Sequence, residues 1–228
     1  MIEIDRLSKT FQIHILRRKV IQALEEVSLK VARGEFLGIC GQSGAGKSTL
    51  LKCIYRTYLS TRGCIWLDSP RWGRIDLARA PHQVILEIRK KEIGYVSQFL
   101  QVLPRVSALD TVAEPLVVKG GLSRQKARQT AAALLEKLHI PSNLFEAYPV
   151  TFSGGERQRI NLARSVVWKP RLLLLDEPTA SLDRQTISVV SSILKDLKEQ
   201  GTTLIGNFHH EDLMTAVMDR GYHLGQEN

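Results

Sequence analysis

Apolar residues in this chain fall into short runs separated by longer amphipathic stretches, a pattern typical of an α/β fold. The runs have the length of buried strands and occur at residues 36–40, 93–96, 172–175 and 202–208. Stretches of helical composition or spacing lie between them, at residues 47–58, 81–91 and 184–200. We expect the last two runs to be parallel strands, with a helix between them.

In the middle of the chain the spacing of apolar residues becomes helical. Residues 107–118 and 123–139 have helical apolar spacing, and Pro141 and Pro149 mark breaks after them. Ser123 is a candidate N-terminal cap of the second helix. We therefore expect an all-helical subdomain inserted into a single domain. The expected division of residues 1–228 is a core at 1–98 and 166–228 and a helical subdomain at 99–165.

Two strand candidates near the N-terminal third predict a hairpin. Residues 65–68 and 74–77 flank a stretch with Pro70 and Gly73, which are turn residues. Trp72 is expected near the hairpin tip, where it either contacts a partner or folds back over neighbouring apolar surface. Residues 1–12 also have the pattern of a strand, because Ile2, Ile4 and Leu7 are interspersed with polar residues.

Composition excludes several classes of protein. No apolar run reaches the roughly 18 residues of a membrane helix, and the N-terminus lacks the layout of a secretion signal, so we expect a cytoplasmic protein without direct membrane insertion. Three cysteines without CxxC spacing favour buried thiols. The net charge of +9 allows a polyanionic partner, but the basic residues form scattered short clusters, so nucleic acid is not the expected partner.

A glycine-rich loop supplies the first candidate chemistry. Residues 41–48 fit the phosphate-loop pattern GxxxxGK[ST] between a strand and a helix. In this pattern backbone N–H groups cradle phosphates, Lys47 reaches the β- and γ-phosphates, and the Ser48 hydroxyl binds Mg²⁺. The candidate nucleotide ligands here are Gly41, Gln42, Ser43, Gly44, Ala45, Gly46, Lys47, Ser48 and Thr49.

Two further stretches restrict the class of phosphate binder. Ser153, Gly154, Gly155 and Glu156 open a helix-prone run and offer a second anion-binding helix N-terminus with close backbone approach. Asp176 and Glu177 end an apolar strand, at the sheet edge where open α/β folds bind ligands. In this order the three motifs resemble the ATP-binding cassette (ABC) family.

The resemblance implies a P-loop NTPase of ABC type, with a mixed sheet core, an antiparallel β subdomain and an inserted helical subdomain. It implies hydrolysis of ATP with Mg²⁺ as cofactor. Asp176 would bind Mg²⁺ through water, and Glu177 would polarise the attacking water. Gln98 matches the glutamine that touches Mg²⁺ or its water in the family. His209 matches the residue that contacts the γ-phosphate.

Some of these assignments leave an alternative open. His210 follows His209 where the family usually has aspartate, so the strand end leaves two candidates for the γ-phosphate contact. Phe11 matches the aromatic residue that stacks on adenine, or it is a core residue. Asp183 matches the loop that crosses the family's dimer interface, and it also suits a helix cap.

The resemblance also implies a head-to-tail dimer, with a second copy or a sister cassette as partner. Each ATP would lie between Lys47 of one chain and Ser153 with Gly155 of the other. Phe152 and Glu156 replace the commoner leucine and glutamine of this motif.

Residues 86–90, 96–109, 151–156 and 208–209, with the hairpin at 68–80, resemble the cassettes of the bacterial carbon-phosphorus lyase pathway for phosphonate catabolism. That pathway is linked to synthesis of ribose 1-methylphosphonate 5-triphosphate, and the lyase core complex would then be a further partner. The alternatives are the nucleotide-binding subunit of a transporter with separate membrane subunits, and an assembly factor that binds ATP without turnover.

Overall fold

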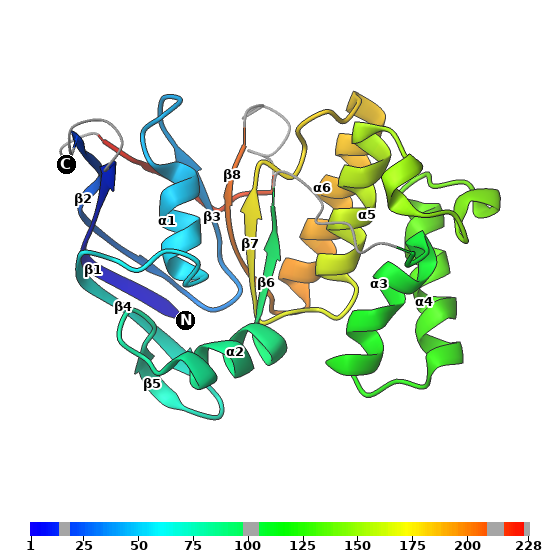
Figure 1. Ribbon diagram of the computed structural model, residues 1–228, viewed down its shortest axis with the longest axis horizontal. Coiled ribbons are helices and arrows are strands. Elements are labelled where there is room, and N and C mark those ends of the chain that lie inside the picture. Colours follow the sequence, from blue (N-terminus) through cyan, green and yellow to red (C-terminus); the bar gives the residue numbers. More distant parts are fainter. Residues whose placement is uncertain (14–18, 98–104, 209–216, 226–228) are drawn as a thin grey trace.

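The computed structural model describes residues 1–13, 19–97, 105–208 and 217–225. Two sheets lie side by side, and a group of helices lies beyond the second sheet (Figure 1). The first sheet is antiparallel, in the order β2-β1-β4-β5. Its strands are β1 (Ile2–Ile13), β2 (Lys19–Val31), β4 (Arg62–Ser69) and β5 (Gly73–Asp76).

The second sheet has the order β6-β7-β8-β3-β9, and each of its described pairings is parallel. Its strands are β3 (Phe36–Cys40), β6 (Ile93–Val96), β7 (Leu172–Asp176), β8 (Thr203–Asn207) and β9 (Arg220–His223). The helices are α1 (Lys47–Ile54), α2 (His82–Lys91), α3 (Ala108–Val118), α4 (Arg124–Lys137), α5 (Gly154–Val166) and α6 (Arg184–Glu199). Two 3₁₀ turns, η1 (Ser142–Leu144) and η2 (Pro149–Thr151), precede α5.

Strand β7 lies between two hydrophobic cores. Leu173 and Leu175 pack with helices α3 to α6, whereas Leu172 and Leu174 pack with α1, α2 and the antiparallel sheet. Successive side chains of a strand point to opposite faces, so a strand covered on both sides must be apolar at every position. This explains the uninterrupted leucine run, whose residues are all fully buried.

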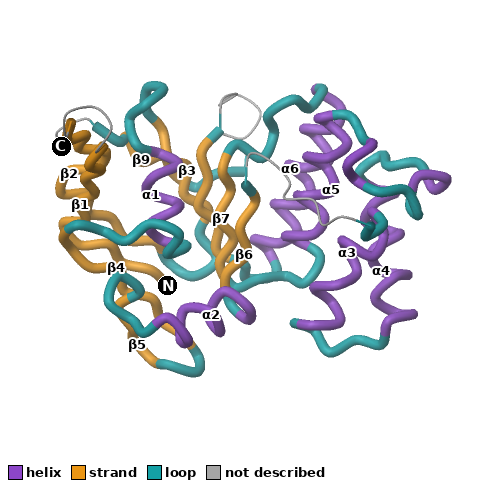
Figure 2. Tube along the Cα trace, viewed as in Figure 1, coloured by secondary structure: helices purple, strands orange, loops and turns teal. Residues whose placement is uncertain are grey.

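The helical group is formed by α3, α4 and α5, which gather on one side of the molecule (Figures 1 and 2). Ser107 caps α3 by accepting from the Asp110 N–H, and Ser123 caps α4 by accepting from Lys126. Both serines therefore satisfy N–H groups that the helix cannot bond internally. The exact limits proposed for the inserted subdomain, residues 99 and 165, stay a prediction.

The sequence prediction missed two strands. Strand β2 escaped detection because the irregular register around Glu26, which has φ +43°, separates buried Leu24 and Val27 by three positions instead of two. Strand β9 has only four residues, of which none is fully buried. The helix predicted over residues 81–91 begins one residue later, because Pro81 is the N-cap of α2.

Trp72 lies at the turn of the β4–β5 hairpin and is 38% exposed, with the Arg71 guanidinium 5.1 Å from its ring centre. Of the cysteines, Cys53 is buried, whereas Cys40 and Cys64 are half-buried.

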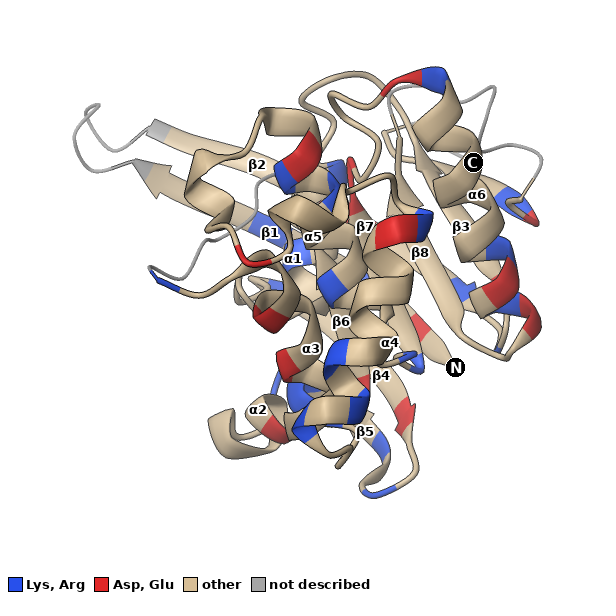
Figure 3. Cartoon of the chain, turned by 90° about the vertical axis from the view of Figure 1, so that its right-hand side faces the viewer, with Lys and Arg blue, Asp and Glu red and all other residues tan. Residues whose placement is uncertain are grey.

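No helix in the described ranges has the length and apolarity needed to cross a membrane. Lysine and arginine are mixed with aspartate and glutamate over the face that carries α3, α4 and α5 (Figure 3).

A partly buried ion pair joins the two sheets. Glu92, just after α2, accepts from the Ser69 hydroxyl at 2.6 Å and from Arg171 Nη1 at 2.9 Å. Arg171 Nη1 also donates to the Asp68 carbonyl at 3.2 Å. The Glu92 side chain is 8% exposed, so its charge depends on these partners for stabilisation.

We predict that Glu92→Ala lowers the free energy of unfolding by about 2–3 kcal/mol, because Arg171 and Ser69 lose a buried partner. The control is Asp196→Asn, which breaks the half-exposed pair of Lys137 and Asp196 and is expected to cost less than about 1 kcal/mol. Chemical denaturation of the three proteins measures both changes. Equal destabilisation by the two variants would contradict the prediction.

Candidate active site

The phosphate-loop residues follow β3 and lead directly into α1. Gly46, the N-cap of α1, has φ +98°, and a Cβ there would lie 2.2 Å from the Ala23 carbonyl oxygen, so only glycine fits. No side chain caps this helix, which leaves its first N–H groups for a ligand. Lys47 Nζ donates to the carbonyls of Gly41 at 2.6 Å and Gln42 at 2.9 Å, so the ammonium lies across the loop. Residues 41–44 are exposed and 45–49 are half-buried.

The carboxylate of Asp176 accepts hydrogen bonds from three side chains, and the residue is 4% exposed. Ser48 Oγ donates to its Oδ1 at 2.7 Å, and Asn207 Nδ2 donates to the same oxygen at 3.1 Å. The Tyr95 hydroxyl donates to Oδ2 at 2.8 Å. Donors from α1, β6 and β8 therefore fix the carboxylate beside the serine that was predicted to bind Mg²⁺.

Asn207 and Tyr95 were absent from the sequence-based site. Asn207 is fully buried at the end of β8 and pairs in register with Asp176. The sequence signal that could have identified it is a polar residue at the end of an apolar strand. Tyr95 gave no such signal, since it sits within an apolar strand. Burial raises the pKa of Tyr95 and the nearby Asp176 raises it further, so the phenol stays protonated as a donor.

Glu177 has a left-handed backbone, with φ +53°, immediately after β7. Its N–H donates to the side-chain oxygen of Asn207 at 2.8 Å and to the Asn207 carbonyl at 3.2 Å. A non-glycine residue holds this conformation only where its surroundings enforce it, and such strain is common at functional sites. Asn207 thus sets the positions of both acidic residues.

The Ser153–Glu156 stretch forms the exposed N-terminus of α5. Ser153 Oγ accepts from the Glu156 N–H at 3.3 Å and donates to its carboxylate at 2.8 Å, while the Ser153 N–H donates to that carboxylate at 2.8 Å. These bonds form a capping box. The hydrogen bond from the Ser153 hydroxyl is the main cause that lowers the pKa of Glu156.

Further along α5, buried Gln158 donates to the carbonyls of Glu177 at 3.4 Å and Pro178 at 3.2 Å. A Cβ on Gly155 would lie 3.0 Å from the Ser181 carbonyl, so the Ser-Gly-Gly stretch lies close to the loop after Glu177. Exposed Asp183 caps α6 through the Thr186 N–H at 2.9 Å, which is the main cause of its lowered pKa.

The structure therefore brings the predicted residues together in two groups. Among the described residues no hydrogen bond joins Ser153–Glu156 to the phosphate-loop residues. Ser48 bonds to Asp176, whereas Gln158, further along α5, bonds to the Glu177 carbonyl. Phe11 is half-buried, with its ring 5.1 Å from that of Tyr58 and 4.6 Å from Lys9 Nζ. Gln98, His209 and His210 lie outside the described residues.

The donor set fits a magnesium nucleotide. Within the described residues no three of His, Cys, Asp and Glu cluster as metal ligands, so one hydroxyl and one carboxylate would hold the ion together with phosphate and water. That sparse protein contribution suits Mg²⁺ bound to a nucleotide. Bound there, Mg²⁺ would neutralise charge on the phosphates.

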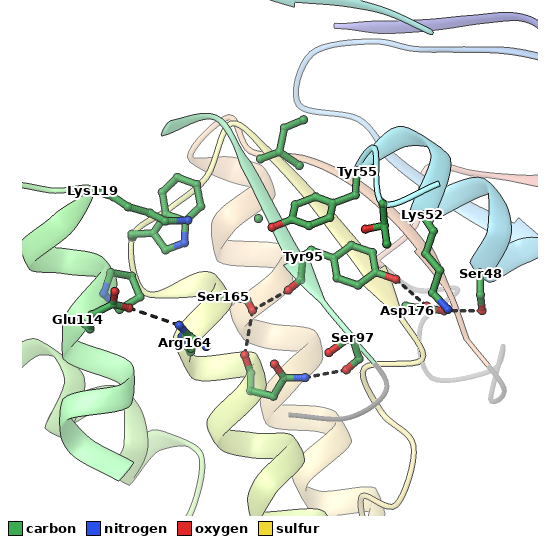
Figure 4. Close-up of a pocket in the computed structure, with 16 residues that line it drawn as sticks. Ser48, Lys52, Tyr55, Tyr95, Ser97, Glu114, Lys119, Arg164, Ser165 and Asp176 are labelled. Carbon is green, nitrogen blue, oxygen red and sulfur yellow. Dashed lines mark hydrogen bonds and ion pairs between the residues drawn. The ribbon is translucent and has the colours of Figure 1, made fainter. Parts of the chain in front are cut away.

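A hollow of about 660 Å³ opens beside Asp176, between the parallel sheet and the helical group (Figure 4). Ser48 and Asp176 line one end, the stacked rings of Tyr55 and Tyr95 line its wall, and Lys119 lies further along. The complete lining is Ser48, Lys52, Tyr55, Thr57, Ile93, Gly94, Tyr95, Ser97, Glu114, Pro115, Lys119, Asn161, Arg164, Ser165, Trp168 and Asp176.

Comparisons with known proteins place this chain in a family. A family model described as ABC transporter matches residues 24–180. The chain is 38% identical over 204 residues to the lipoprotein-releasing system ATP-binding protein LolD of Bordetella avium, covering 90% of this chain and 86% of that protein. It is 37% identical over 228 residues to the methionine import ATP-binding protein MetN of Thermobifida fusca, covering 97% of this chain and 68% of that protein.

Among solved structures, the dimeric ATP-binding cassette MJ0796 in a post-hydrolysis state bound to ADP and Pi superposes with a TM-score of 0.88. The two are 30% identical, over 98% of this chain and 94% of that chain. This confirms the predicted P-loop NTPase fold of ABC type. The chain belongs to the ABC transporter family, as an ATPase domain that uses ATP with Mg²⁺.

Proposed function

We propose that this chain is the nucleotide-binding subunit of an ABC transporter whose membrane subunits are separate chains, and that it works on the cytoplasmic side as a head-to-tail dimer. The observation that carries the dimer is the separation of the two site groups within one chain. Exposed Ser153 and Gly154 bond to no phosphate-loop residue among those described, so this helix N-terminus is proposed to bind the nucleotide held by a second chain.

In the proposed dimer each ATP lies between Lys47 of one chain and Ser153 with Gly155 of the other. Glu177 orients and polarises the attacking water, and its strained backbone keeps it beside Asp176. Gln98 and His209 are proposed to contact Mg²⁺ or its water and the γ-phosphate. Phe11 is proposed to stack on adenine, and Asp183 to lie at the dimer interface.

The hollow beside Asp176 is the proposed docking place for a partner subunit. It borders the Mg²⁺ ligands at one end and the helical group at the other. A partner seated there would contact Tyr95, whose hydroxyl bonds to Asp176. The relatives named for lipoprotein release and methionine import favour a transport complex as the source of that partner.

A second candidate places the same ATPase on the carbon-phosphorus lyase core complex, as a protein of the PhnL type. The observation in its favour is the resemblance of residues 86–90, 96–109, 151–156 and 208–209, together with the long hairpin that carries Trp72. The ATPase chemistry is the same for both candidates, since the partner determines what work the motor performs.

We predict that Glu177→Gln lowers ATP turnover at least about 100-fold, because an amide cannot act as a general base. The affinity for ATP is expected to change little, since glutamine has the same shape and places the same strain on the backbone. Glu136→Gln, an exposed change of the same type on α4, is the control and is expected to keep wild-type turnover. Unchanged turnover in Glu177→Gln would remove this residue from the mechanism.

We predict that two inactive variants, Lys47→Ala and Gly155→Asp, recover ATP turnover when mixed. In a head-to-tail dimer the mixed pair has one site with both changes and one intact site, so random pairing leaves about a quarter of the sites intact. Each variant alone is the control. If both motifs acted within one chain, mixing would restore nothing.

We predict that the chain with Glu177→Gln and ATP co-elutes in size-exclusion chromatography with the membrane subunits encoded beside its gene, purified in detergent. The comparison arm uses the purified carbon-phosphorus lyase core complex. Co-elution with the membrane subunits alone supports the transporter proposal, and co-elution with the lyase core alone replaces it with the second candidate. Binding to neither rejects both.

A further inference from the structure

Lys119 is a half-buried cation on the wall of the hollow, just after the end of α3. Its Nζ lies 3.8 Å from the centre of the Trp168 ring and donates to the Arg89 carbonyl at 3.4 Å. The carbonyl and the ring account for two of its three donors. No carboxylate of the described residues lies within salt-bridge distance of this ammonium.

The other charges of the hollow already have partners or carry the same sign. Glu114 pairs with Arg164 at 3.5 Å, and Asp176 is bonded to Ser48, Tyr95 and Asn207. Lys52 lies over the Tyr58 ring at 5.6 Å and forms no salt bridge within the described residues. The hollow therefore presents two cations, Lys52 and Lys119, that lack an acidic partner in this part of the chain.

Apolar residues lie near Lys119. Pro115 and half-buried Trp168 line the hollow. Val117 and Val118 precede Lys119 in the chain and are 38% and 49% exposed. Apolar contact area next to one half-buried cation suits a protein segment with an apolar side and an acidic residue. A free phosphate or a nucleic acid would leave these apolar side chains uncovered.

We propose that the partner seated in the hollow presents an aspartate or glutamate to Lys119, with apolar side chains beside it on Trp168 and the two valines. The proposal rests on the proposed function, because it takes the hollow as the docking place of a partner protein. It adds the chemistry of that partner: an acidic, partly apolar segment. A buried carboxylate would complete the ion pair that Lys119 lacks in the described chain.

The test takes the partner complex identified by co-elution with the Glu177→Gln chain and titrates it in isothermal calorimetry. Lys119→Glu is expected to weaken binding about tenfold or more, Lys119→Gln less, and Lys119→Arg about threefold at most. Lys195→Glu on α6 is the matched control, with the same charge reversal at an exposed position, and is expected to bind like wild type. Thermal denaturation first shows that all four variants are folded.

Changing each acidic residue of the partner's docking segment to lysine completes the test. One such change is expected to weaken binding to wild type and to restore binding to Lys119→Glu. If wild type binds the partner and Lys119→Glu binds equally well, this inference fails and the proposed function survives. If wild type binds neither membrane subunits nor lyase core, both fail. If polyphosphate or RNA binds the wild-type chain more tightly than the partner does, the ligand of the hollow is a polyanion and not an acidic protein segment.

The pH dependence of binding provides a second readout. Burial lowers the pKa of Lys119 to about 8, Glu114 of α3 raises it, and Arg164 of α5 lowers it further. The backbone of Arg89, which follows from α2, also faces the ammonium. A carboxylate binds the charged form, so association is expected to be strongest below about pH 8 and to fall up to tenfold per unit above it. Lys119→Arg, which stays charged, is expected to lose this dependence, and an identical profile in both proteins would contradict the ion pair.

Discussion

The buried carboxylate of Asp176 is the constraint on which the rest of the site depends. A charge at 4% exposure is tolerated only where donors surround it, and here they come from three different elements. Ser48 brings α1 to the end of β7, while Tyr95 and Asn207 come from the strands on either side. The same Asn207 holds the backbone of Glu177. Asp176 and its partner Asn207 thus tie together the phosphate-loop serine, three neighbouring strands and the strained residue.

Tyr95 connects this carboxylate with the hollow. Its ring stacks on Tyr55 at 4.9 Å, Tyr55 lies under the Arg89 guanidinium, and both tyrosines line the hollow. The same hydroxyl bonds to Asp176. The Tyr95 side chain therefore provides direct physical contact between the proposed docking surface and the proposed metal ligand.

A feature of this molecule can be predicted from the sequence when the residues that determine it are contiguous in the chain. The phosphate loop, the leucine strand and the capped helices follow from contiguous residues, and the structure has them where the sequence places them. The partners of Asp176 could not be predicted from contiguous residues, because Tyr95 and Asn207 lie beside it only as a result of the order of the strands. The contact of Lys119 with Trp168 depends likewise on how α3 packs on α5. Strand β2 was missed because an irregular register breaks its alternation. Gln98 and the choice between His209 and His210 stay predictions.

The capping box of α5 has a consequence for how two chains can separate. In the free chain the Ser153 hydroxyl already donates to the carboxylate of Glu156, which also holds the Ser153 N–H. A phosphate that takes this hydroxyl must displace a negatively charged acceptor of the same chain and then remain beside it. In the proposed dimer, glutamate in place of the commoner glutamine would act as an internal competitor and would bias the closed pair of chains toward release.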